Sequence, residues 1–161
     1  MKVTRTAVLV KPDGLQRGLI GEIISRFERK GLKLVGLKMV RLDDNQLDRW
    51  YSEHREKSFF HDLKSFMSSM PIVAMAWEGI EAVPVVRRLV GTTLGREAEG
   101  GSIRGDFGMS QQMNLIHASS SNEDAEREIA IVFGDSELFK YHGVTEAVIY
   151  AEGEAEFENG K

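Results

Sequence analysis

The sequence predicts an α+β fold, an α/β sandwich in which helices cover a four-stranded antiparallel sheet. Apolar, β-branched segments alternate along the chain with segments whose apolar residues recur at helical spacing, and Gly, Pro or Asp separates them. The 161 residues suffice for one domain with a sizeable core, and the chain has no internal repeat or linker. We therefore expect a single domain over residues 1–161, with an acidic tail from about residue 151.

Composition narrows the class of protein. The chain has no Cys, which excludes disulfides and thiolate metal sites and favours a cytoplasmic protein. Its formal net charge of −4 argues against broad, charge-driven nucleic-acid binding, although it allows a local basic pocket. The apolar run near the N-terminus is far too short to cross a membrane and ends at Lys11-Pro12, so we expect no membrane partner.

The first predicted strand is Thr4–Val10, which is apolar and β-branched. Lys11–Gly14 then predicts a turn, because its Pro sets φ, its Asp can form an Asx-turn and its Gly permits a positive φ. This turn leaves Lys11 at a strand end, where it is either a phosphate or sugar contact or an ordinary edge lysine.

The next elements alternate between helix and strand. Apolar residues at helical spacing predict a helix over Gly18–Lys30, which Gly31 ends. A strand follows over Leu32–Leu42, and its alternation changes parity around Val35-Gly36, which predicts a bulge. The two acids that open Asp43–Tyr51 predict the start of a second helix, since negative charge is favourable there.

The middle of the chain predicts a short helix over Phe59–Met67. Either one of its two leading aromatic rings faces outward as a stacking platform, or both rings lie in the core. The continuous apolar run Pro71–Trp77 predicts a central strand. A helix follows over Glu81–Val90, in which the consecutive Arg87 and Arg88 point about 100° apart and cannot serve one purpose.

Two further segments complete the predicted order of elements. The Gly-rich loop Gly91–Gly101 continues through Ile103–Phe107, and long irregular segments inside compact domains are usually functional. Near the C-terminus, Val144–Tyr150 predicts a last short strand, and the acidic tail after it is expected to fray or to pack against a neighbouring subunit. The order fits a ferredoxin-like split-βαβ arrangement with helices on one face of the sheet.

The stretch around His117 carries the chemistry. Asn114–Ile116 predicts a strand end before this histidine, and Ser121–Asp124 predicts a capping box that starts a helix running to Val132, a favourable place for phosphate. Glu128 lies further along that helix and can fix the tautomer of the imidazole. This layout suits a nucleophilic histidine with one ring nitrogen held and the other free, although a satisfied polar residue at a strand end is the alternative.

The chain closely resembles the nucleoside diphosphate kinase family from about Thr6 to Tyr150. It has no Walker loop and no protein-kinase motif, so side chains must hold the phosphates. The resemblance rests on separated motifs in the family's order: KPDG at Lys11, RGLIG at Arg17, FF at Phe59, VAMAWEG at Val73, SIRGDF at Ser102 and NLIHAS at Asn114.

The resemblance implies a ping-pong reaction through a phosphohistidine. His117 takes the γ-phosphoryl group of a nucleoside triphosphate such as ATP and passes it to a diphosphate such as GDP, releasing ADP from ATP; broad base specificity then maintains the NTP and dNTP pools. Glu128 matches the carboxylate that anchors the ring, and Tyr51 and Ser119 match the residues that flank the histidine. Magnesium is the expected cofactor, bridging the β- and γ-phosphate oxygens with few or no direct protein ligands.

The remaining family positions bind substrate. Lys11 and Asn114 match residues around the ribose 3′-hydroxyl and the transferred phosphate, and Phe59 matches the base-stacking position, which makes Phe60 the core ring. Stacking tolerates every base because each has a π-face. Phosphate contacts match at four positions: His54, Arg87, Thr93 and Arg104.

Three departures from the family pattern are visible. Ser120 stands where the family commonly has Asp, so either Glu123 or Asp124 assists magnesium instead or metal binding is weaker. Met70 replaces a Gly before the central strand, and Gly95 lies where the loop usually has Pro. Because that loop is commonly an intersubunit contact, the expected homohexamer or tetramer is left open.

Two other functions are possible from the sequence. One is a catalytically silent ferredoxin-like regulator that binds nucleotides, but binding alone would not require His117 and its anchoring Glu128. The other is a nucleic-acid-binding role, against which the acidic net charge argues.

Overall fold

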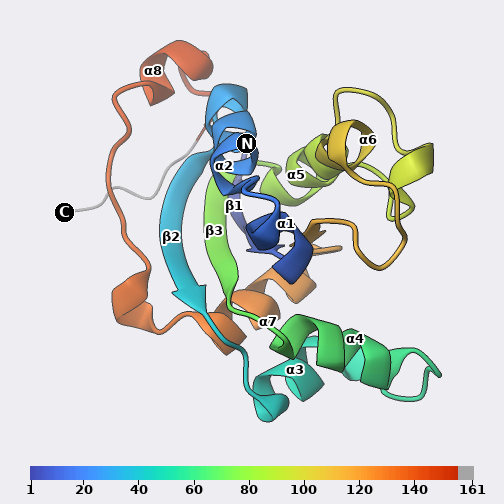
Figure 1. Ribbon diagram of the computed structural model, residues 1–161. Coiled ribbons are helices and arrows are strands. Elements are labelled where there is room, and N and C mark those ends of the chain that lie inside the picture. The colour runs from blue at the N-terminus through green and yellow to red at the C-terminus, as the bar shows by residue number, and fades with distance from the viewer. Residues whose placement is uncertain (156–161) are drawn as a thin grey trace.

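The computed structural model describes residues 1–155 and has a four-stranded antiparallel sheet at its centre (Figure 1). The strands lie in the order β2-β3-β1-β4. Their bounds are Val3–Val10 for β1, Lys33–Val40 for β2, Ile72–Ile80 for β3 and Ile116–Ala118 for β4. The fold class and the split-βαβ strand order predicted from sequence are therefore confirmed.

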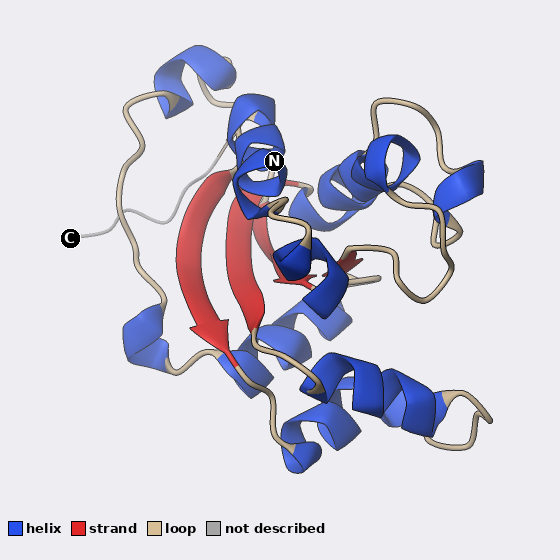
Figure 2. Cartoon of the chain, viewed as in Figure 1, coloured by secondary structure: helices blue, strands red, loops and turns tan. Residues whose placement is uncertain are grey.

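Helices lie on both faces of this sheet, so the expectation of helices on one face was wrong (Figure 2). Ala7 and Leu9 of β1 pack into one apolar cluster, whereas Val8 and Val10 pack into the other. A strand that is apolar on both faces needs cover on both faces. The helices are α1 Pro12–Gln16, α2 Ile20–Lys30, α3 Asp44–Trp50, α4 Phe60–Ser68, α5 Ala82–Val90, α6 Ile103–Phe107, α7 Asn122–Val132 and α8 Glu146–Ile149.

The two clusters assign the helices to faces. Helices α3, α4 and α7 cover one face, where Leu47, Phe60 and Ile129 contribute buried side chains. Helices α2 and α5 cover the other, through residues such as Phe27 and Val86. Helix α7 packs along β1, and its Glu128 reaches His117 on the edge strand β4.

Several local predictions hold. Gly31 ends α2 with a φ of 94°, a conformation that glycine adopts without steric cost. The pairing of β2 with β3 shifts register between Leu34 and Gly36, which is the expected bulge. Asp43 caps α3 in a complete capping box with Gln46.

Two segments expected to be irregular are helical. Pro12–Gln16 forms α1, with its Pro at the start, where the missing N–H costs no hydrogen bond. The Asp13 carboxylate accepts from the Leu115 N–H and so forms no Asx-turn within its own segment. Ile103–Phe107 forms α6, because the Ser102 hydroxyl caps its start by accepting from the Gly105 N–H.

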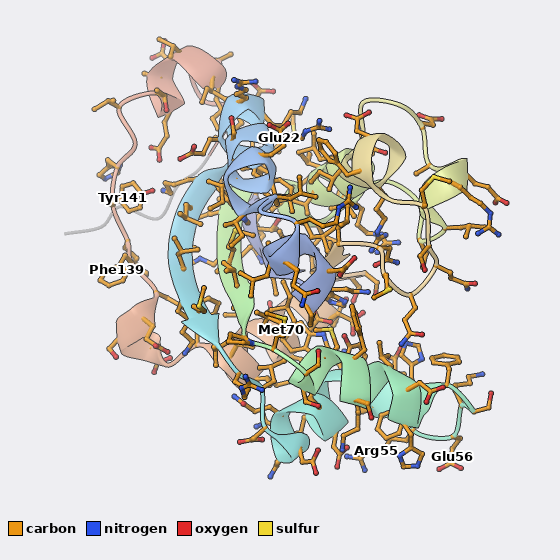
Figure 3. The ribbon with its side chains drawn as sticks, in the orientation of Figure 1. Glu22, Arg55, Glu56, Met70, Phe139 and Tyr141 are labelled. Carbon is orange, nitrogen blue, oxygen red and sulfur yellow. The ribbon has the colours of Figure 1, made fainter. Side chains whose placement is uncertain are left out.

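The last predicted strand was also wrong, since part of Val144–Tyr150 forms α8. The segment before it already runs beside β2, where the Phe139 N–H donates to the Val35 carbonyl, and Figure 3 shows Phe139 and Tyr141 along this segment. Glu146 accepts from the Gly143 N–H and pairs with Lys33, which stabilises a helical turn. The acidic tail lies largely outside the described residues.

Two of the family departures have a simple structural reason. Among the described non-glycine residues, only Glu81 and Leu115 have positive φ, so the turn at Met70 needs no glycine. A Cβ at Gly95 would lie 2.6 Å from the backbone of Gly108, so this position needs glycine because two loops pass close together. Within residues 1–155, no helix combines the length and hydropathy that crossing a membrane requires.

Only one of the two hydrogen bonds of the predicted capping box is present at the start of α7. The Ser121 hydroxyl accepts from the Asp124 N–H, but the Asp124 carboxylate turns to Ser120 and Arg127 rather than back to the cap. Ser121 therefore satisfies one of the free N–H groups of the helix that carries Glu128.

We predict that Ser121→Ala lowers the free energy of unfolding by about 1 kcal/mol, because the capping hydrogen bond is lost. Urea denaturation of both proteins at the same concentration measures this difference in the free energy of unfolding. Ser121→Asp, which retains a capping oxygen, serves as the control and should stay close to the parent protein. Equal stability of Ser121→Ala and the parent would contradict a capping role.

Candidate active site

The site forms where the end of β1 meets the start of β4. His117 lies opposite Leu9 in the β1–β4 pairing, so the residues just after β1 and just before β4 are neighbours. Lys11 Nζ donates to Asn114 Oδ1 at 2.7 Å across this junction. The antiparallel pairing thereby brings together two segments that are far apart in the sequence.

His117 is held from one side only. Its Nε2 lies 3.0 Å from Glu128 Oε1, and the other carboxylate oxygen accepts from the Ser119 hydroxyl at 2.7 Å. Ser119 Oγ in turn accepts from the Ala7 N–H of β1. Glu128 is only 4% exposed. In the described chain no hydrogen bond engages His117 Nδ1, so this is the nitrogen available for attack.

Two aromatic residues at the C-terminal end of α3 line the same pocket as His117. The ring of Trp50 meets the ring of His117 edge-on, with centroids 5.2 Å apart and planes 70° apart. Tyr51 is also buried, and burial, with the charge of Glu128 adding to it, raises the pKa of its hydroxyl far above the ordinary value. Tyr51 therefore stays a neutral hydroxyl that can donate a hydrogen bond.

Three cationic side chains line the same pocket as His117: Lys11, Arg87 and Arg104. Burial, and then the charge of Arg104, lowers the pKa of Lys11 from 10.5 to about 8, while Asp13 opposes the shift. Burial, and then Arg87, lowers the pKa of Arg104 to about 10, and Asp13 again opposes it. Cations that lower one another's pKa in this way leave the site with excess positive charge. A bound polyphosphate would compensate that charge.

Asn114 and Arg104 are already engaged with the protein. The Asn114 amide donates to the carbonyls of Thr93 and Gln111. Arg104 donates to the carbonyls of Gly91, Asn114 and Ile116. Both side chains thus tie the loop before β4 in place, and Arg104 has only part of its five N–H donors left for a phosphate.

These side chains line a pocket of about 770 Å³, a size typical of small-ligand sites. Phe59 is 47% exposed at its mouth, whereas Phe60 is 8% exposed in the core. The His54 ring lies between those of Tyr51 and Phe59, so a row of aromatic rings leads from the buried Tyr51 out to the exposed Phe59. Of the residues predicted for the site, the following line this pocket: Lys11, Tyr51, His54, Phe59, Arg87, Thr93, Arg104, Asn114, His117 and Glu128.

The other predicted site residue and one neighbouring arginine lie elsewhere. Ser119 is fully buried behind Glu128 and does not line the pocket. Arg88 points away from the pocket that Arg87 lines, as consecutive helical residues must.

The rim at the start of α7 contains one carboxylate, Asp124. Hydrogen bonding from Ser120 and the charge of Arg127 hold the pKa of this carboxyl below its ordinary value. Asp124 lines the pocket and Glu123 does not. Within residues 1–155, no group of three or more His, Cys, Asp or Glu is placed to hold a metal ion.

Sequence reasoning missed several residues at the site. Trp50 was assigned to a helix, but nothing in its spacing indicated contact with His117. Asp13 was placed in a turn, although its carboxylate crosses to Leu115. Only the missing acid at Ser120 pointed to the nearby Asp124, and nothing in the sequence pointed to Arg127.

Comparison with known proteins identifies the family of this chain. The family model described as "Nucleoside diphosphate kinase" matches residues 4–138. A nucleoside diphosphate kinase of Staphylothermus marinus is 55% identical over 141 residues, covering 88% of this chain and all of that protein. One from Archaeoglobus fulgidus is 51% identical over 148 residues, covering 92% and 98%.

Solved structures agree as well. A halophilic nucleoside diphosphate kinase from Halobacterium salinarum, in complex with CDP, has a TM-score of 0.88 and 48% identity over 91% of this chain and 97% of that chain. The Aquifex aeolicus nucleoside diphosphate kinase has a TM-score of 0.82 and 40% identity, covering 85% and 99%. The chain therefore belongs to the nucleoside diphosphate kinase family and is an enzyme with that activity.

Proposed function

We propose that the γ-phosphoryl group travels through His117 Nδ1 in a ping-pong reaction. The observation that carries this proposal is the hydrogen bond between His117 Nε2 and Glu128. It keeps the proton on Nε2 and the lone pair on Nδ1. The Nδ1–P bond forms as the bond from phosphorus to the β-phosphate oxygen breaks, and the diphosphate leaves with those electrons. Glu128 offsets the positive charge that the imidazole gains, and the acceptor diphosphate reverses the step.

The other pocket residues have proposed roles in binding. Lys11, Arg87 and Arg104 supply positive charge for the phosphates, and His54 and Thr93 add polar contacts at the same wall. Phe59 is available to stack on the base because its ring is exposed at the mouth. Tyr51 donates a hydrogen bond near His117, and Asn114 orients Lys11 toward the ribose and transferred phosphate.

Magnesium is the proposed cofactor, entering with the nucleotide. When bound, it neutralises charge on the β- and γ-phosphate oxygens. We propose that Asp124 takes the place of the acid missing at Ser120, since of the carboxylates that line the pocket it is the one bonded to Ser120 at the start of α7. Its hydrogen bond from Ser120 and its ion pair with Arg127 keep it ionised and oriented.

We also propose a single functional domain over residues 1–161, acting in the cytoplasm as a homohexamer or tetramer. An edge strand with exposed apolar side chains favours self-association. Leu37 and Met39 on the edge strand β2 are 49% and 61% exposed. Phe139, beside the same strand in Figure 3, is exposed as well. A nucleic-acid partner is not proposed, in keeping with the net charge.

The proposed pathway is tested with γ-labelled ATP and magnesium. The parent enzyme should become labelled, with a label that is labile in acid and stable in base and that leaves as GTP when GDP is added. His117→Ala should take up no label while still binding ADP, because the nucleophile is removed. His142→Ala, a histidine outside the pocket, is the matched control and should label normally. Labelling of His117→Ala would contradict the assignment.

Glu128→Gln should slow label uptake at least about tenfold, because a neutral amide cannot offset the positive charge that the imidazole gains. Rapid-quench measurement of phosphoenzyme formation gives the rate. Glu126→Gln, on the exposed side of the same helix, should leave the rate unchanged. Equal rates for the two variants would remove Glu128 from the mechanism.

The pH dependence of kcat/KM should report Lys11. Because the pKa of Lys11 is lowered to about 8, this side chain is cationic below pH 8 and loses its charge above it. We therefore predict that kcat/KM for a diphosphate falls as the pH rises through about 8, since phosphate attraction weakens. Lys11→Arg, which stays charged, should remove this decline even if its rate is lower. A decline that persists in Lys11→Arg would assign the titration to another group.

A further inference from the structure

The backbone just before the nucleophile is strained. Leu115 has a φ of 75°, a conformation that branched residues rarely adopt. The Ile116 N–H donates to the Asn114 carbonyl at 2.9 Å, closing a three-residue γ-turn with Leu115 at its centre. This kind of turn is rare and persists only when its surroundings enforce it. Leu115 is fully buried, so those surroundings are protein.

The segment that follows β1 encloses Leu115 from two sides. Asp13 Oδ2 accepts from the Leu115 N–H at 3.0 Å, and the Lys11 N–H donates to the Leu115 carbonyl at 2.9 Å. A Cβ on Gly14 would lie 2.8 Å from that carbonyl oxygen, so only glycine lets the two backbones approach so closely. Of these contacts, only the one from Asp13 is made by a side chain.

The turn sets the spacing of the site. Asn114, which bonds Lys11, lies at its start, and His117 follows its end. Arg104 donates to the carbonyls on both sides of Leu115, those of Asn114 and Ile116. A relaxed Leu115 would therefore move His117 relative to both the substrate cations and Glu128.

Asp13 is a costly group to bury. It is 7% exposed, and its Oδ1 has no hydrogen-bond partner among the described residues. An unpaired buried carboxylate oxygen destabilises a fold. Its negative charge also raises the pKa of Lys11 and of Arg104 against the effect of burial. Asp13 does not line the pocket, and the phosphoryl transfer proposed above assigns it no role. Its contact with the site is the hydrogen bond from the Leu115 N–H.

We propose that Asp13 is a positioning residue for phosphoryl transfer: its carboxylate holds the strained turn at Leu115, and the turn holds His117 and Asn114 on either side of the transferred group. This inference rests on the proposed transfer through His117. Asp13 touches no reacting atom. It acts through the backbone of Leu115 and, by its charge, on Lys11.

A pair of variants separates position from charge. Asp13→Asn retains an acceptor oxygen at the same reach but loses the charge, whereas Asp13→Glu retains the charge but moves the oxygen by one methylene. We expect Asp13→Glu to lower kcat about 100-fold at neutral pH, the effect of a small misplacement. Asp13→Asn should keep most of kcat, and the high-pH decline of kcat/KM should move to lower pH because Lys11 loses its negative neighbour.

Rates are scaled to the fraction of protein that folds, measured by near-UV circular dichroism, so loss of stability alone cannot imitate the effect. A fast Asp13→Glu enzyme, or an Asp13→Asn enzyme as slow as Asp13→Glu, would overturn the proposal. If Asp13→Asn folds poorly, the kcat of Asp13→Glu decides the outcome alone. The parent's phosphoenzyme yield in the same experiment tests transfer through His117 separately, so the two proposals fail in distinguishable ways.

Discussion

The site depends on one chain of hydrogen bonds, from the β1 backbone through Ser119 and Glu128 to His117 Nε2. A buried carboxylate is stable only when its oxygens are engaged, and both oxygens of Glu128 are. The same bonds link β1, the loop after β4 and α7, so the packing of the fold also orients the imidazole. The imidazole is thus fixed by the sheet and a helix rather than by a mobile loop, which suits the role we propose for it, receiving and releasing a phosphoryl group in one geometry.

The cations around the pocket form the second constraint. Lys11 and Arg104 are buried at a cost that their lowered pKa values express, and a bound polyphosphate relieves that cost. If these cations bind the phosphates as we propose, part of the binding energy for the nucleotide comes from unfavourable charge already present in the free enzyme. The exposed Phe59, which we propose stacks on the base, would add affinity without reading the base edges, as broad specificity requires.

Much of this was predictable from sequence because the signals were local. Apolar spacing, caps and glycines indicated the sheet strands and the larger helices, and the family motifs indicated which side chains converge on His117. The errors arose where a residue's partner is distant. Asp13 looked like a turn residue because its partner, Leu115, is known only once β1 and β4 pair. Val144–Tyr150 looked like a strand because it contains β-branched residues. The ion pair between Glu146 and the distant Lys33, which stabilises a helical turn there, leaves no signal in the local sequence. The contact between Trp50 and His117 depends on how α3 packs, and burial alone does not name a neighbour.

The most direct test of the account is to determine which nitrogen of His117 carries phosphorus. Phosphoenzyme made from ATP and ¹⁵N-labelled protein can be studied by NMR, in which coupling to ³¹P and the ring ¹⁵N shifts distinguish the two nitrogens. The account predicts phosphorus on Nδ1, with the Nε2 proton retained toward Glu128. Phosphorus on Nε2 would show that the hydrogen bond from Glu128 does not select the nucleophile, and would contradict the account at its centre.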